Sequence, residues 1–173
     1  MGVSGSGKST VANLLVERLG WKFAEGDDFH PPANVEKMRS GHPLDDEDRW
    51  PWLRTLAEWI GEQERAGASC IVTCSALKRR YRDLLRDGHP SVWFAHVSAA
   101  PELIHERIER RSGHYMPSSL LDSQLATLEP LQSDEPGMTV SGVDRPDVVV
   151  DELLAALNRE RSIPIPGPRE PSS

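Results

Sequence analysis

The sequence predicts an α/β fold built around a mainly parallel sheet. Along most of the 173 residues, short apolar runs typical of buried strands alternate with longer segments whose apolar residues recur at helical spacing. The apolar fraction is 38% without glycine and about 45% with the 13 glycines included, which is typical of a globular chain. This length corresponds to one ordinary domain that is large enough to bury its own core.

Start and stop signals place the elements along the chain. Gly20, Gly41 and Gly67 end three of the predicted helices, and Pro32 begins one of them. We expect helices at residues 9–19, 32–40, 46–66, 78–86, 101–111, 118–128 and 146–159. We expect strands at residues 21–24, 69–73, 92–97 and 138–140.

The end of the chain differs in composition from the rest. Four prolines within residues 161–173 leave no regular structure available, so we predict a domain over residues 1–160 and a disordered tail. Residues 148–151 read Val-Val-Val-Asp and resemble the apolar strand and acid of a second nucleotide-binding motif. Their continuation has helical spacing, which favours the start of the last helix instead.

Charge and cysteine content exclude several classes of protein. The chain has 20 Lys and Arg against 27 Asp and Glu, a formal net charge of −7, which argues against nucleic-acid binding but allows a local cationic pocket. No run of eighteen apolar residues occurs, so we expect no membrane span, and the first residues lack the apolar core of a signal peptide. Cys70 and Cys74 are too few for a disulfide framework or a zinc site and fit a reducing cytoplasm.

The strongest motif lies at the start of the chain. Residues 2–9 read Gly-Val-Ser-Gly-Ser-Gly-Lys-Ser and fit the phosphate-loop pattern G-x-x-x-x-G-K-[S/T]. Glycines let backbone N–H groups turn inward around an anion, and the helix that follows adds its positive end. Lys8 would reach the outer phosphates as a point charge, and Ser9 would offer a hydroxyl to Mg²⁺. The alternative is a Gly/Ser linker that leads into a helix.

One part of this motif is missing. A phosphate loop normally follows a strand, but only Met1 precedes Gly2 here. We therefore expect the first strand of the sheet to be absent from this chain. Either Met1 is an internal residue of a longer reading frame, or the chain is truly shortened.

Acidic and basic side chains follow the predicted strands, where an open α/β sheet holds its substrate. Asp27 and Asp28 form an acidic turn, and a carboxylate there can orient an acceptor hydroxyl and take its proton. Further along the chain, Arg49 can clamp a carboxylate bidentately. For the two aspartates, a solvated acidic turn is an equally good interpretation.

A second basic segment precedes a loop bounded by glycine and proline. Arg107 and Arg111 are four residues apart and hence lie on one face of the predicted helix. This spacing suits a lid that carries cations over a transferring phosphate and excludes water. The alternative, compensation of a helix dipole, does not explain why phosphate loop, acidic turn and basic lid occur in that order.

Together these segments resemble one family, the small P-loop gluconokinases, which are relatives of shikimate and nucleoside-monophosphate kinases. The resemblance extends from Gly2 to about Leu157. Its main segments are residues 2–9, Asp-Asp-Phe-His-Pro at 27–31, Asp-Arg at 48–49 with Pro-Trp-Leu at 51–53, Cys-Ser-Ala-Leu-Lys at 74–78 and Gly-His-Tyr-Met-Pro at 113–117.

The resemblance implies a three-layer α/β/α P-loop kinase fold with a small lid at about residues 107–130. It also implies ATP-dependent phosphorylation of D-gluconate to 6-phospho-D-gluconate, which feeds the pentose phosphate pathway. By the same analogy, the protein would be a cytoplasmic homodimer that uses Mg²⁺.

The resemblance also assigns roles to individual residues. The ATP site would comprise Gly2, Val3, Ser4, Gly5, Ser6, Gly7, Lys8, Ser9 and Thr10, with Ser9 on the metal. The catalytic residues would be Lys8, Asp27 as the base, and the lid cations Arg107 and Arg111. The substrate pocket would contain Asp28, His30, Arg49, Ser75, Lys78 and His114, with Arg49 on the gluconate carboxylate.

Two other functions remain open at this point. One is another small-molecule kinase of the same fold, such as a shikimate kinase, although the segments at 49–53 and 74–78 argue against it. The other is a nucleotide-binding module without turnover, which would bind ATP and release no ADP.

Overall fold

The computed structural model describes residues 1–110 and 118–160 and contains every helix and strand that the sequence predicts, with ends that differ by at most two residues. The helices are α1 (Lys8–Leu19), α2 (Pro32–Arg39), α3 (Asp46–Arg65), α4 (Arg79–Arg86), α5 (Pro101–Glu109), α6 (Ser118–Thr127) and α7 (Pro146–Glu160). The strands are β1 (Lys22–Glu25), β2 (Cys70–Thr73), β3 (Phe94–Ser98) and β4 (Gly137–Ser141). The structure also contains a 3₁₀ turn, η1 (Gly26–Phe29), which the sequence analysis did not predict. The predicted tail at 161–173 lies outside the described residues.

All strand pairing among the described residues is parallel, as predicted, but the sheet is not continuous. β1 pairs with β2, with Glu25 opposite Thr73, and β3 pairs with β4, with Ser98 opposite Ser141. β2 and β3 are not paired with each other. Next to the phosphate loop, the Met1 amino nitrogen donates to the Ala95 carbonyl oxygen of β3, and the Met1 carbonyl oxygen accepts from the Val97 N–H.

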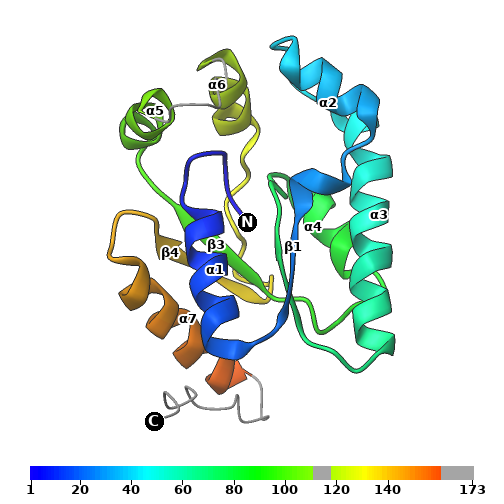
Figure 1. The fold of residues 1–173 in the computed structure, drawn as a ribbon, viewed down its shortest axis with the longest axis vertical. Coiled ribbons are helices and arrows are strands. Elements are labelled where there is room, and N and C mark those ends of the chain that lie inside the picture. The colour runs from blue at the N-terminus through cyan, green and yellow to red at the C-terminus, as the bar shows by residue number, and fades with distance from the viewer. Residues whose placement is uncertain (111–117, 161–173) are drawn as a thin grey trace.

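Helices cover both faces of the strands and complete three layers (Figure 1). On one side, α1 and α7 pack with β3 and β4 around Leu15, Val97 and Leu153. On the other side, α3 and α4 pack around Trp52 and Leu56, which are both fully buried. The described residues include no helix that is both long and apolar enough to cross a membrane.

The start of α3 is fixed by a reciprocal cap. The Asp45 carboxylate accepts from the Asp48 backbone N–H at 3.0 Å, and the Asp48 carboxylate accepts from the Asp45 N–H at 2.9 Å. Such a capping box satisfies two backbone donors that a helix start leaves unpaired. Because Arg49 follows directly, the cap holds the turn that presents this arginine.

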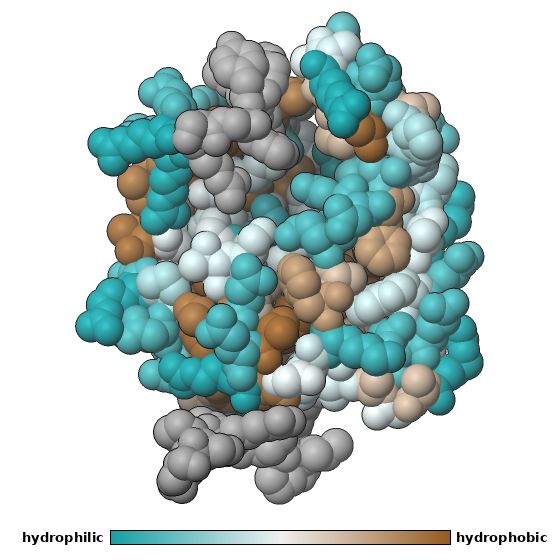
Figure 2. Space-filling model, in the orientation of Figure 1, coloured by the Kyte–Doolittle hydropathy of each residue, from teal (hydrophilic) through white to brown (hydrophobic). Residues whose placement is uncertain are grey.

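A third cluster joins the elements at the end of the molecule where α5 and α6 lie (Figure 1). Val3 of the phosphate loop, Leu77 before α4, Ile104 of α5 and Leu121 of α6 pack together, and all are at most 3% exposed. The visible face in Figure 2 is mostly hydrophilic, with hydrophobic atoms in separate patches. The buried cluster around Val3 therefore packs the phosphate loop against α5 and α6, which overlap the predicted lid at about residues 107–130.

Candidate active site

The phosphate loop has the backbone that its glycines predict. Gly2, Gly5 and Gly7 have φ values of 138°, 77° and 106°, a region that side chains with a Cβ rarely adopt. At Gly2 a Cβ would also lie 2.5 Å from the Val97 carbonyl oxygen. Gly7 is the residue before α1, so the chain turns directly into the amino end of that helix. This arrangement directs backbone N–H groups and the helix dipole at an anion.

The two functional side chains of the loop lie at its carboxyl end. The Lys8 Nζ donates to the Val3 carbonyl oxygen at 2.8 Å, so the side chain folds back over the loop. The Ser9 hydroxyl donates to Glu25 Oε2 at 3.1 Å. The other Glu25 oxygen accepts from the Thr73 hydroxyl. Glu25 at the end of β1 thus connects the loop serine to the end of β2.

Glu25 is a site residue to which the sequence analysis gave no role, although it stands in the same acidic segment as Asp27. The signal that would have found it is its place as the last residue of β1, since carboxyl ends of parallel strands meet at one edge. A carboxylate beside a hydroxyl is the kind of oxygen ligand set that Mg²⁺ prefers.

The loop opens into a cavity of about 740 Å³. Lys8 and Ser9 line it together with Asp27 of η1 and Arg107 of α5, so the structure brings these four predicted residues into one site. The segment after β4, from Ser141 to Pro146, forms another part of the wall. The sequence analysis missed this segment, and its signal was again a short polar run at the carboxyl end of a strand.

Arg49 lies in a second, more buried part of the site. It is 6% exposed, and its guanidinium carbon lies 6.0 Å from the centre of the Trp52 ring and 5.8 Å from that of Tyr81. Its Nε donates to the Leu44 carbonyl oxygen at 3.4 Å, and its Nη1 donates to the Ser75 hydroxyl at 3.5 Å. Aromatic faces and few hydrogen bonds leave this cation able to take a further anionic partner.

Lys78 lies near the same Tyr81 ring as Arg49. Its Nζ donates to Asp46 at 2.9 Å and lies 5.7 Å from the centre of the Tyr81 ring. Asp46 also accepts from the Tyr81 hydroxyl and from Arg80. These donors, the Tyr81 hydroxyl first and Lys78 second, lower the pKa of Asp46. The carboxylate therefore stays ionised and holds Lys78 in place.

His30 packs into the same region as a neutral side chain. Its ring stacks on Trp52 with centres 4.2 Å apart and an angle of 19° between planes. Burial, and next the positive charge of Arg49, lower its pKa to about 4. Its Nε2 lies 3.9 Å from Asp27 Oδ1, and its Nδ1 lies 3.4 Å from the Asn34 amide. His30 thus connects the acidic turn to the Arg49 region.

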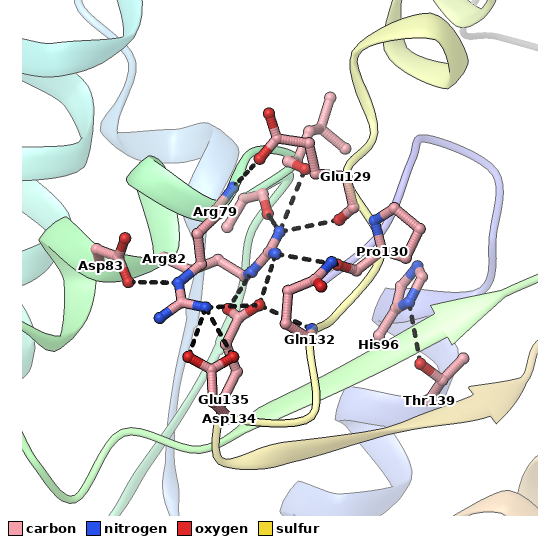
Figure 3. Close-up of polar contacts among 12 residues, drawn as sticks. Arg79, Arg82, Asp83, His96, Glu129, Pro130, Gln132, Asp134, Glu135 and Thr139 are labelled. Carbon is pink, nitrogen blue, oxygen red and sulfur yellow. Dashed lines mark hydrogen bonds and ion pairs between the residues drawn. The ribbon is translucent and has the colours of Figure 1, made fainter.

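A buried ion pair holds the loop that carries Ser75 and Lys78 (Figure 3). Arg82 and Glu135, with side chains 0% and 2% exposed, form two hydrogen bonds of 2.5 and 2.8 Å. Arg82 also donates to the carbonyl oxygens of Leu77 and Glu129 at 3.2 and 3.1 Å. One guanidinium therefore joins the segment before α4 to the segment that follows α6.

The phosphate loop also contacts α6 directly. The backbone N–H of Ser4 donates to Gln124 Oε1 at 2.8 Å, and Gln124 Nε2 donates to the Ser4 hydroxyl at 3.3 Å. Ser6 differs, because its hydroxyl is buried and has no hydrogen-bond partner among the described residues. This hydroxyl lies inside the turn of the loop, 3.0 Å from the place of a Cβ on Gly2.

The remaining predicted site residues are either exposed or outside the described residues. Thr10 on α1 and Asp28 on η1 are exposed, and only Thr10 lines the cavity at the loop. Arg111 and His114 lie outside the described residues. The site therefore unites the predicted loop, Asp27, His30, Arg49, Ser75, Lys78 and Arg107.

Comparisons with known proteins indicate which family the chain resembles. A family model described as "AAA domain" matches residues 1–131. A gluconokinase of Gluconobacter oxydans is 53% identical over 160 residues, which cover 92% of this chain and 90% of that protein. The crystal structure of a sugar kinase from Janibacter is 52% identical, with a TM-score of 0.87 and 91% of each chain covered. That of a gluconokinase from Sinorhizobium meliloti is 43% identical, with a TM-score of 0.83 over 92% of this chain and 90% of that one.

Proposed function

The chain belongs to the gluconokinase family of P-loop kinases, and on that premise we propose that it transfers the γ-phosphoryl group of ATP to D-gluconate. The products are ADP and 6-phospho-D-gluconate. The observation that carries the proposal is the single cavity that joins Lys8 and Ser9 to Asp27 and Arg107, next to the buried Arg49. A phosphate-binding loop, a carboxylate base and a cationic acceptor pocket are the parts that this transfer needs.

The loop holds the phosphates of ATP. Backbone N–H groups between Gly2 and Gly7 surround the β-phosphate, and Lys8 leaves the Val3 carbonyl to contact the β- and γ-phosphates. Arg107, which lines the same cavity, adds positive charge where the phosphoryl group develops negative charge in the transition state. Arg111, four residues later in the sequence, is assigned the same role.

The residues at the loop fit a magnesium ion. Ser9 and Glu25 present a hydroxyl and a carboxylate within 3.1 Å of each other at the cavity, and Mg²⁺ is commonly held by one or two such oxygens plus phosphates and water. When bound, the ion neutralises charge on the β- and γ-phosphates. Glu25 positions Ser9 for this contact through their hydrogen bond.

The acceptor pocket binds the carboxylate of gluconate. Arg49 takes the carboxylate, because its guanidinium is buried against two aromatic rings and has only weak protein hydrogen bonds. Ser75 and Lys78 contact the nearer hydroxyls, and His30 separates this end from Asp27. Asp28 and His114 remain candidate substrate contacts.

Asp27 acts on the other end of the substrate. Its carboxylate lines the same cavity as Lys8, so it can orient the terminal hydroxyl of gluconate toward the γ-phosphate. The hydroxyl oxygen forms the new bond to phosphorus, its proton passes to Asp27, and the bond to the β-phosphate oxygen breaks.

Use of Mg²⁺, a homodimer, a cytoplasmic location and a role in the pentose phosphate pathway belong to the same proposal.

A panel of acceptors tests this function. The full chain is incubated with ATP, Mg²⁺ and one acceptor at a time: gluconate, shikimate, adenylate or a related sugar acid. We expect ADP release well above background with gluconate and little with the others. Preference for another acceptor would identify a different kinase of this fold. ATP binding without ADP release on any acceptor would indicate a nucleotide-binding module.

A further inference from the structure

The phosphate loop contains a tight turn over residues 3–6. The Ser6 N–H donates to the Val3 carbonyl oxygen at 3.3 Å, and Gly5, the third residue of the turn, has a φ of 77°. A positive φ at this position is typical of a type II turn, which pairs the N–H of its fourth residue and not that of its second. The N–H and the hydroxyl of Ser4 therefore need partners from outside the turn.

A single side chain of α6 pairs with both groups. Gln124 Oε1 accepts from the Ser4 N–H at 2.8 Å, and Gln124 Nε2 donates to the Ser4 hydroxyl at 3.3 Å. Only the oxygen of the amide can accept from a backbone N–H, so this pair of bonds fixes the amide in one orientation. Because the two residues are 120 positions apart in the sequence, the bonds connect the loop to a distant element.

The same peptide unit is held at its other end by Lys8. The Lys8 Nζ donates to the Val3 carbonyl oxygen at 2.8 Å. The peptide between Val3 and Ser4 is trans, so its carbonyl and its N–H point in opposite directions. By holding the N–H, Gln124 therefore fixes the direction of the carbonyl that binds the Lys8 ammonium.

The helix that carries Gln124 is anchored on both sides of this residue. Leu121, three residues earlier, is fully buried and belongs to the same cluster as Val3 of the loop. After the helix ends, the buried Arg82 donates to the Glu129 carbonyl oxygen at 3.1 Å (Figure 3). The Gln124 amide therefore has a defined position relative to the loop.

Gln124 lies behind the loop rather than in the cavity. Ser4, Gly5 and Lys8 line the cavity of about 740 Å³, and Gln124 is not among the described residues that line it. A side chain in this place acts on bound phosphates only through the loop. The geometry thus suits a residue that prepares the backbone for the nucleotide.

We propose that Gln124 is a positioning residue for ATP binding: it holds the Val3–Ser4 peptide so that the phosphate loop has its binding conformation before the nucleotide arrives. Without Gln124 the peptide can rotate, the Val3 carbonyl turns away from Lys8, and part of the binding free energy of ATP is used to restore the loop. Once ATP is bound, its phosphates hold the loop, so the loss falls on ATP affinity and not on the transfer step. The inference rests on the proposed use of ATP and is independent of the acceptor.

The test replaces the amide by a side chain of similar length. Gln124→Met removes both hydrogen bonds, and the control Gln132→Met makes the same change at a glutamine whose amide donates to the Pro130 carbonyl oxygen instead. Calorimetry of ATP binding with Mg²⁺, which needs no acceptor, should give a Kd about tenfold higher for Gln124→Met and unchanged for Gln132→Met. With gluconate present, the KM for ATP should rise to a similar extent. The kcat at saturating ATP and the KM for gluconate should change by less than about twofold.

A second readout follows the hydrogen bond itself. Exchange of the Ser4 amide hydrogen should be at least about tenfold faster in Gln124→Met, while exchange in α7 stays the same. An unchanged Kd for ATP in the folded Gln124→Met protein would overturn the proposal. An equal rise in both KM values together with a lower melting temperature would also overturn it, because that result indicates a general loss of structure.

A shorter amide keeps the test decisive if the methionine variant does not fold. In Gln124→Asn the side chain is one methylene shorter and does not reach the Ser4 N–H, so we expect the same rise in the Kd for ATP. An unchanged Kd would contradict the proposal. Lack of turnover with every acceptor would instead refute the proposed function, and the binding measurement would still decide the role of Gln124.

Discussion

We propose that the phosphate loop and the acceptor pocket both hold anions, and the two are built differently. The loop is one continuous segment that offers mainly backbone N–H groups, together with Lys8, and it has positive φ at three glycines. The pocket is assembled from side chains on η1, α3 and the segment before α4, and its central cation, Arg49, is buried among aromatic rings. Loss of the Lys8 side chain from the loop should therefore lower kcat. Loss of a side chain from the pocket should instead raise the KM for gluconate or lower the free energy of unfolding.

The largest effect is expected at the loop. Replacing Lys8 by alanine removes the only predicted loop cation, so kcat should fall by about 10³- to 10⁵-fold, as for other cations that stabilise a transferring phosphoryl group. Gluconate binding, measured by calorimetry, should be nearly unchanged. Lys22→Ala, on the exposed side of β1, is the control and should retain normal turnover. A Lys8→Ala variant with normal kcat would contradict the mechanism.

The support behind the pocket should show the next largest effect. Arg82→Met leaves Glu135 buried without its partner, so the free energy of unfolding should fall by about 3 to 5 kcal/mol in denaturant titrations. In the double variant Arg82→Met/Glu135→Leu no charge is stranded, and much of that loss should be recovered. A double variant as unstable as the single one would show that the carbonyl contacts of Arg82, rather than the ion pair, hold this region.

Recognition in the pocket is tested by a conservative change. Arg49→Lys keeps the charge but loses the planar, bidentate guanidinium, so the KM for gluconate should rise about 10- to 100-fold with a smaller change in kcat. The KM for ATP should stay the same. Arg54→Lys, exposed on the same helix, serves as the matched control. An equal rise in both KM values would place Arg49 outside the gluconate site.

A smaller effect is expected at the carboxylate beside Ser9. Glu25→Gln retains the shape and loses the charge, so the Mg²⁺ concentration for half-maximal activity should rise about tenfold. Glu58→Gln, on the exposed face of α3, should leave it unchanged. An unaltered Mg²⁺ dependence of the Glu25 variant would remove this residue from the metal site.

The smallest effect concerns stability in acid. The pKa of His30 is about 4 in the folded chain, below the ordinary value of 6.5, so the unfolded chain takes up the proton first as pH falls. The free energy of unfolding should therefore decrease between pH 6.5 and about 4. His30→Phe, which can still stack on Trp52, should show a shallower decrease, whereas exposed His42→Gln should not. His96, whose burial also lowers its pKa to about 4, accounts for part of the remaining slope.

The two regions also differ in how far the sequence alone predicts them. The loop is local, so its motif and the following helix predicted both its residues and its conformation. Glu25 and the segment after β4 were missed because each is defined by the strand end it follows and by contacts with distant residues, such as the bond to Ser9. The lack of pairing between β2 and β3 and the hydrogen bonds of Met1 with β3 needed coordinates.

The most direct test of the central claim compares two acceptors that differ at one end. D-Gluconate and D-glucose both carry a terminal hydroxyl for Asp27, but only gluconate has a carboxylate for Arg49. With ATP and Mg²⁺, we expect ADP release with gluconate, a ³¹P NMR signal of a phosphate ester on C6, and at least about 100-fold lower kcat/KM with glucose. Comparable rates with both sugars, or no ester with gluconate, would contradict the account.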